Sequence, residues 1–246
     1  MTHPSCLARA RLLVVATLLL MASASSAQSC PPAAEQIAKA HGLESFGQVE
    51  AIRYTFNADF PSLKFKVTQH WIWEPKADRV TFEGVDKEGK PVKVTYVRSQ
   101  LDSQPANVKA EVDPAFINGQ YNLLFPFHAC WDTAASVQDN GMQKLPIGKG
   151  SARQVVVKYP AEGGYTPGDT WELFVGPDNR VRELFFRHGG SAPPKIYKTP
   201  WADYRKAGPI VVALDRRGIA DGKPGRIWFT DVAVKLTGSD AWMNAQ

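Results

Sequence analysis

The sequence predicts a mainly β protein of the α+β class, built on one large, strongly curved antiparallel sheet. Three observations predict this fold: long segments that alternate apolar and polar residues, tight turn signals between them, and one apolar segment that interrupts the alternation. The composition, 44% hydrophobic and 22% charged, is that of an ordinary globular protein. We expect a single domain, because β-rich architectures often run to about 200–250 residues as one unit.

The first 27 residues have the features of a secretory signal peptide. Arg9 and Arg11 precede the apolar run LLVVATLLLMA, and small residues lead to a cleavage site after Ala27. The run is too short to span a bilayer, which needs about 20 apolar residues. We therefore expect an exported domain over residues 28–246, periplasmic or secreted, with no transmembrane segment.

The charge of the chain does not favour a nucleic-acid partner. Removal of residues 1–27 takes away two arginines, so the formal net charge falls from +5 to +3. No cluster of five or more basic residues occurs, and an export signal points away from nucleic acid. We expect no nucleic-acid binding.

The expected elements begin with a helix and continue with strands. Apolar residues from Ala34 to His41 recur at helical spacing, and Gly42 is a suitable stop. From Gln48 onward the apolar period changes from 3.6 to 2, which is typical of half-buried strands. About ten strands are predicted, in the segments VEAIRYTFNADF, LKFKVTQHWIW, DRVTFEGVD, PVKVTYVR, ARQVVVKYP, DTWELFVGP, RVRELFFR, APPKIYKTPWADYR, GPIVVALDRRG and GRIWFTDVAVKL.

The segment from Leu101 to Pro146 is different, because it lacks strand alternation. It contains DPAFINGQYNLLFPFHACWD, for which we predict one or two short helices broken at Pro126. A helix over 116–127 is too apolar to lie exposed, so it needs an apolar partner. The apolar face of the first two strands needs a cover in turn.

Two cysteines, Cys30 and Cys130, remain after signal removal, in a compartment where disulfides persist. They could pair with each other. Alternatively, Cys30 could carry the lipid of an outer-membrane lipoprotein, which requires an aliphatic residue three positions earlier, where Ala27 stands. The disulfide is therefore the favoured alternative.

The chain contains none of the common catalytic or metal-binding motifs, so we expect no enzyme activity, no metal and no cofactor. His128 and Cys130 cannot form a dyad on a helix, because side chains at i and i+2 point about 200° apart. We expect His128 to donate to a backbone carbonyl. A hydrolase that uses His128 with Asp132 or Asp169 is the less favoured alternative.

The aromatic residues have two interpretations that converge. Trp71 and Trp73 share a strand face with other large apolar side chains, which could simply fill the core. If the concave side of the sheet is only partly filled, the same side chains line a pocket for an apolar ligand. We expect the lining to comprise Tyr54, Phe56, Phe65, Trp71, Trp73, Leu124, Phe125 and Phe127.

Several segments resemble the lipoprotein-carrier-like (Lol-like) superfamily. The helix ending in HGLESF before a long strand is similar to its opening, and TPWADYRKAGPIVVALDRRG is similar to a strand-turn-strand near its C-terminal side. YNLLFPFHACWD, LPIGKG, YPAEGGYTPGDTWELFV and RIWFTDVAVKL resemble an uncharacterised secreted bacterial subgroup of it. The resemblance implies an incomplete barrel whose open mouth is plugged by helices, and a hydrophobic cavity that accepts lipids or lipoprotein acyl chains.

The sequence therefore predicts an exported binding protein that holds an apolar, lipid- or acyl-chain-like ligand in the concave side of a half-barrel. Two alternatives stay open. One is a non-catalytic interaction module whose partner is another envelope protein, and the other is the hydrolase built on His128.

Overall fold

The computed structural model describes residues 30–246, so the expected signal peptide lies outside the described residues. The helices are α1 (Pro32–Ala40), α2 (Leu43–Phe46) and α3 (Asp113–Trp131). The strands are β1 (Val49–Phe60), β2 (Phe65–Glu74), β3 (Arg79–Val85), β4 (Pro91–Val97), β5 (Ser136–Lys144), β6 (Ser151–Lys158), β7 (Thr170–Val175), β8 (Val181–Arg187), β9 (Ile196–Pro200), β10 (Ala202–Ala207), β11 (Ile210–Ala220), β12 (Lys223–Leu236) and β13 (Trp242–Asn244).

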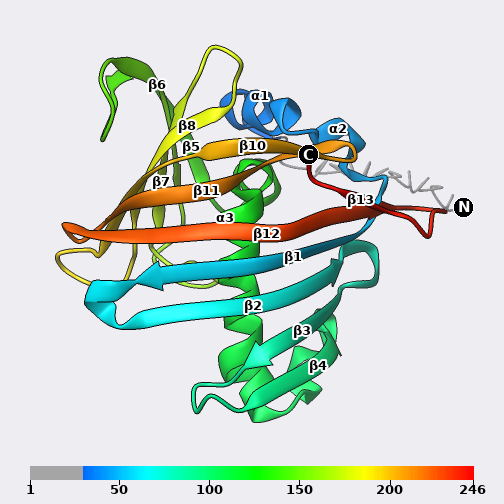
Figure 1. The fold of residues 1–246 in the computed structure, drawn as a ribbon. Helices are drawn as coiled ribbons and strands as arrows, with labels where there is room; N and C mark the ends of the chain where they lie inside the picture. The colour runs from blue at the N-terminus through cyan, green and yellow to red at the C-terminus, as the bar shows by residue number, and fades with distance from the viewer. Residues whose placement is uncertain (1–29) are drawn as a thin grey trace, which may run out of the picture.

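All thirteen strands belong to one antiparallel sheet, as Figure 1 shows. The strand order is β4-β3-β2-β1-β12-β11-β9-β8-β7-β6-β5, with β10 added to β11 and β13 added to β12. The sheet curves without closing, and α3 crosses its concave side while α1 lies near one end of that helix. The predicted fold class is confirmed: a mainly β protein with one strongly curved sheet, an N-terminal helix and a central helical plug.

Three strands were not predicted, each for a physical reason. β5 is almost wholly exposed and polar, so it shows no apolar alternation. The single strand expected around Trp201 is two strands, because the chain leaves β9 at Pro200 and pairs again with β11 as β10. β13 is only three residues long, too short for a pattern to indicate it.

The predicted break in the central helical segment is present, but it does not fall at Pro126 itself, since α3 consists of two helical stretches joined across a kink. The irregularity falls two residues earlier, at Leu124, whose φ of −117° and ψ of 18° depart from helical values. Proline lacks an N–H and crowds the preceding turn, so the distortion is placed on its N-terminal side. Burial of nearly every side chain between 119 and 129 supports the helix despite this defect.

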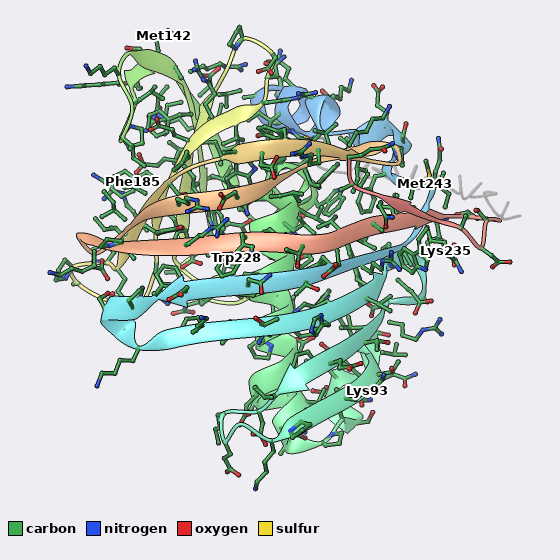
Figure 2. All side chains as sticks on the ribbon, in the orientation of Figure 1. Lys93, Met142, Phe185, Trp228, Lys235 and Met243 are labelled. Carbon is green, nitrogen blue, oxygen red and sulfur yellow. A yellow bond between two sulfur atoms is a disulfide. The ribbon has the colours of Figure 1, made fainter. Side chains whose placement is uncertain are left out.

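Because successive side chains along a strand point to opposite faces, the two faces of the sheet carry different kinds of residue. On the concave face, Tyr54, Trp71 and Phe82 lie opposite one another on β1, β2 and β3 and are buried. Outward-facing side chains are polar or charged over much of the opposite face, and Figure 2 shows Lys93 on β4 and Lys235 towards the end of β12, both apart from Trp228. Each large side chain buried on the concave face stabilises the fold by roughly 1.5–3 kcal/mol.

A disulfide between Cys30 and Cys130 links the residues before α1 to the last turn of α3. The two cysteines are separated by 100 residues, so the bond closes a long loop that includes β1 to β4. Closing a loop of this size removes much of the conformational freedom of the unfolded chain.

We predict that the double variant Cys30→Ala/Cys130→Ala loses about 2–4 kcal/mol of unfolding free energy, as measured by urea denaturation. A reducing agent should lower the stability of the wild-type protein by a similar amount and leave the double variant unchanged. Equal stability of the two proteins under oxidising conditions would contradict this role.

His41 caps the C-terminal end of α1 and is buried. Its Nδ1 lies 2.7 Å from the carbonyl oxygen of Ile37, and its own carbonyl accepts a hydrogen bond from the backbone N–H of Val211 on β11. Burial lowers the pKa of His41 to about 4, because the charged imidazolium is poorly solvated there.

The lowered pKa of His41 predicts acid sensitivity between pH 6.5 and 4. In that window the unfolded chain, whose histidine pKa is about 6.5, binds a proton that the folded protein excludes. The free energy of unfolding should therefore fall as the pH drops, by up to about 3 kcal/mol. His41→Asn keeps a donor near the Ile37 carbonyl but does not titrate, so its stability should show a much shallower slope in this window. Retention of the full slope in the variant would contradict the assignment.

Candidate ligand-binding cavity

A cavity of about 600 Å³ lies between the concave face of the sheet and the first half of α3. Most of its wall comes from three parts of the chain: concave-face side chains of the strands, the first half of α3, and the connection between β6 and β7. The lining comprises Phe56, Ala58, Phe60, Phe65, Leu101, Lys109, Asp113, Pro114, Ile117, Asn118, Tyr121, Asn122, Gly164, Tyr165, Thr166, Asp169, Trp171, Leu184, Phe186, His188, Tyr197 and Ile227.

The sheet wall is aromatic at the turn between β1 and β2. The ring of Phe60 lies 6.3 Å from that of Phe65 and 5.6 Å from that of Tyr197. Phe60 also covers Gly225 on β12 so closely that a Cβ atom there would come within 2.3 Å of the ring. A glycine at 225 therefore allows this aromatic cluster to form at the end of the cavity.

Deeper in the cavity, smaller side chains leave room. Ala58 on β1 and Ile227 on β12 are directly opposed in the sheet and both line the wall. Ile117 faces the cavity from α3. The ring of Trp171 closes the far side and stacks at 3.9 Å on Phe125, which fixes its orientation.

Polar groups also belong to the lining, and they hold separate elements together. Buried Asp113, at the start of α3, accepts hydrogen bonds from the Tyr96 hydroxyl at 2.9 Å and from Arg98 Nε at 3.0 Å. The Arg98 guanidinium also lies 4.9 Å from the ring of Tyr165, in the connection between β6 and β7. This connection is thereby held across the cavity next to α3.

A second polar contact in the lining involves Asp169. Asp169 is buried and accepts the backbone N–H of Gly189 at 2.7 Å, and its carboxylate lies 2.9 Å from Nδ1 of His188. Asp169 is therefore paired with His188 and not with His128. Two cavity-lining donors, Thr166 Oγ1 and Trp171 Nε1, have no hydrogen-bond partner within residues 30–246.

The structure divides the eight predicted ligand-binding residues into three groups. Phe56 and Phe65 line the cavity. Trp73 is partly buried against Phe46 and Phe116. The other five are buried where α3 packs on the sheet: Tyr54, Trp71, Leu124, Phe125 and Phe127. Contact of any of the eight with a ligand stays a prediction.

Sequence reasoning missed several lining residues, Ile117, Trp171, Tyr197 and Ile227 among them. Their strand alternation did indicate an inward face for Trp171 and Ile227. The pattern did not indicate which end of the concave face is hollow, because that depends on where α3 crosses the sheet.

His128 lies outside this cavity, in a buried network at the end of α3. Its Nε2 is 2.8 Å from Gln120 Oε1, its Nδ1 is 3.1 Å from Asp132 Oδ1, and Tyr121 stacks on its ring at 3.8 Å. The expected backbone-carbonyl partner is therefore wrong, because two side chains occupy both ring nitrogens.

Asp132 is the acceptor at the centre of this network. Besides its contact with His128, it accepts hydrogen bonds from the hydroxyls of Tyr121 at 2.7 Å and Tyr159 at 2.6 Å. Burial alone would raise the pKa of Asp132, but the hydrogen bonds from His128 and the tyrosines outweigh it and hold the pKa below its usual value. The network ties the end of α3 to β6 through the Tyr159 side chain.

No helix within residues 30–246 is long and apolar enough to span a bilayer. No group of three or more His, Cys, Asp and Glu side chains is arranged there to hold a metal ion.

No family model and no curated protein matches the sequence. Three solved structures are similar in fold over most of their length. They are a DUF1329 family protein from Desulfovibrio piger (8% identity, TM-score 0.44, 85% of this chain and 94% of that chain), an outer membrane lipoprotein-sorting protein domain from Vibrio parahaemolyticus (10%, 0.43, 84% and 95%) and a LolA superfamily protein from Nitrosomonas europaea (7%, 0.45, 83% and 92%). At these identities the likenesses concern the fold alone.

Proposed function

We propose that the protein is an exported binding protein that holds an apolar, lipid- or acyl-chain-like ligand in the cavity between the sheet and α3. The observation that carries the proposal is the cavity itself. Its volume of about 600 Å³ falls within the range of small-molecule sites, about 300–1,000 Å³, and its lining is mainly apolar.

Those of the eight predicted residues that are buried between α3 and the sheet also have a role in the proposed binding. Tyr54, Trp71 and Phe127 belong to the continuous apolar interface between α3 and the sheet. α3 is irregular at Leu124, so its two halves can shift relative to each other more easily than the halves of a regular helix. A ligand longer than the cavity, such as a lipoprotein acyl chain, would then extend along this interface.

We predict that Ile117→Trp weakens binding of a fluorescent fatty acid at least about 10-fold, because the larger ring occupies cavity volume. The matched control is Ile72→Trp on β2. Ile72 pairs with Arg53 and Thr81 on the outer face of the sheet, so the same substitution there should leave the affinity unchanged.

Native mass spectrometry of protein purified from a cell envelope should in addition show bound lipid. Absence of both co-purified lipid and fatty-acid binding would overturn the proposed function. Equal affinities of the two tryptophan variants and the wild-type protein would place the ligand elsewhere.

A further inference from the structure

Arg216, on β11, is a fully buried cation with no acceptor. Its exposed fraction is 0%, and none of its three guanidinium nitrogens has a hydrogen-bond partner among residues 30–246. Arginine is almost never buried without a partner, because the charged group loses its hydration. Such a group in a native fold requires an explanation.

The side chain of Arg216 points to the concave side of the sheet. Arg216 is directly opposite Ile227 on β12, and opposed residues of an antiparallel pair project to the same face. Its guanidinium carbon lies 3.7 Å from the ring of Trp201 and 5.3 Å from the ring of Phe229. These rings attract the cation but offer no acceptor oxygen.

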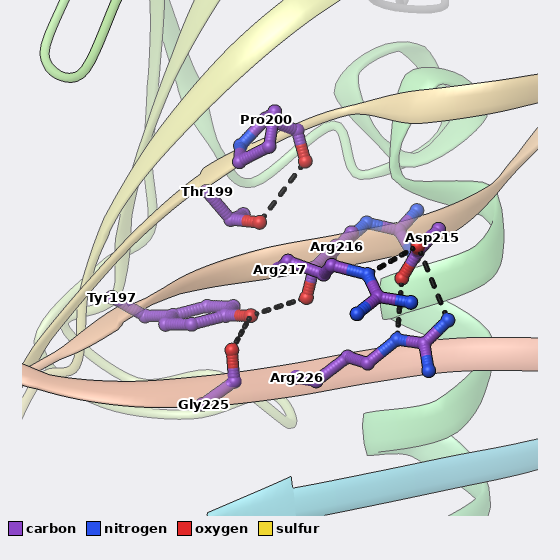
Figure 3. Close-up of polar contacts among 8 residues, drawn as sticks. All are labelled: Tyr197, Thr199, Pro200, Asp215, Arg216, Arg217, Gly225 and Arg226. Carbon is purple, nitrogen blue, oxygen red and sulfur yellow. Dashed lines mark hydrogen bonds and ion pairs between the residues drawn. The ribbon is translucent and has the colours of Figure 1, made fainter.

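The charged side chains next to Arg216 in the sequence take part in ion pairs on the outer face of the sheet. Asp215 accepts hydrogen bonds from Arg217 Nε at 3.0 Å and from Arg226 Nε at 2.8 Å, as Figure 3 shows. The carboxylate nearest in sequence is therefore committed to two other arginines. Burial lowers the pKa of Arg216 to about 10, which still leaves the side chain charged at neutral pH.

Arg216 is not itself among the residues that line the proposed ligand cavity, but two of its neighbours are. Its cross-strand neighbour Ile227 lines that cavity, and so does Tyr197, whose hydroxyl donates to the backbone carbonyl of Arg216 at 2.8 Å (Figure 3). A guanidinium fork binds a carboxylate through two parallel hydrogen bonds, and such bonds are strongest where water is excluded.

We propose that the ligand is an anionic amphiphile, a long-chain carboxylate, whose headgroup pairs with Arg216 while its chain occupies the apolar cavity. The inference rests on the proposed function and narrows its ligand class. A single carboxylate matches the single buried cation.

The test compares palmitate with hexadecanol, which has the same chain length and no charge, by displacement of a neutral fluorescent dye from the full-length mature protein. We expect wild-type protein to bind palmitate at least about 10-fold more tightly than hexadecanol, because hydrogen bonds to charged groups are among the strongest. In Arg216→Met the two affinities should become equal. Arg217→Met, at the next position but on the outer face, should keep the wild-type preference.

The melting temperature of ligand-free Arg216→Met checks the fold, and it should not fall, because methionine replaces an unpaired buried charge. Equal binding of palmitate and hexadecanol by the wild-type protein would overturn the inference without use of any variant, and leave the carrier function in place. A palmitate preference that persists in Arg216→Met would also overturn it. Binding of neither compound would overturn the carrier function, and this inference with it.

Discussion

The concave face of the sheet must be covered, and this requirement organises the rest of the molecule. Large apolar side chains on β1, β2, β3 and β12 point to one side, and curvature brings them around a common axis. A single helix, α3, is long enough to cross that axis and apolar enough to pack against it. Contact between α3 and the sheet supplies most of the core, and the cavity is the part of the concave face that α3 leaves uncovered.

Because so much of the core depends on α3, both of its ends are held. At its start, Asp113 pairs with Arg98 and Tyr96, which fixes the helix to β4 and the segment after it. At its end, the disulfide links Cys130 to the N-terminal segment, and Asp132 binds Tyr159. The middle carries the irregularity at Leu124 and has no polar contact of comparable strength to the sheet among the described residues. Any adjustment of the helix to a ligand is therefore easiest between its two ends.

Much of this architecture could be predicted from the sequence, because strand alternation and turn residues act locally. The inward positions of Tyr54, Phe56 and Trp71 follow from a period of two. The position of the hollow does not, since it depends on the path of α3 across a sheet whose strands come from distant parts of the chain. Of the two partners of His128, Asp132 was among the candidates named from the sequence, and Gln120 was missed. Gln120 lies eight residues away, more than two turns of α3, and Leu124 distorts the helix between them.

Arg216 was missed on different grounds. In GPIVVALDRRG it is one of two adjacent arginines, and alternation requires one of the pair to face inward without indicating which. The register with β12 resolves the choice, because Arg216 opposes Ile227 and Arg217 opposes Arg226.

The open sheet ends at β4 and β5, and each presents backbone groups on its outer side that no other described strand pairs with. Such edges are templates for the addition of a strand from another molecule, and natural sheet proteins discourage it. β5 does so with a polar, exposed surface and a register shift between Asp139 and Met142. β4 begins with Pro91 and carries Lys93 on its exposed side. Because the barrel is incomplete, its sheet has two free edges, and these edges need protection. The protected edges let the protein keep an accessible interior without becoming prone to polymerise through its own sheet.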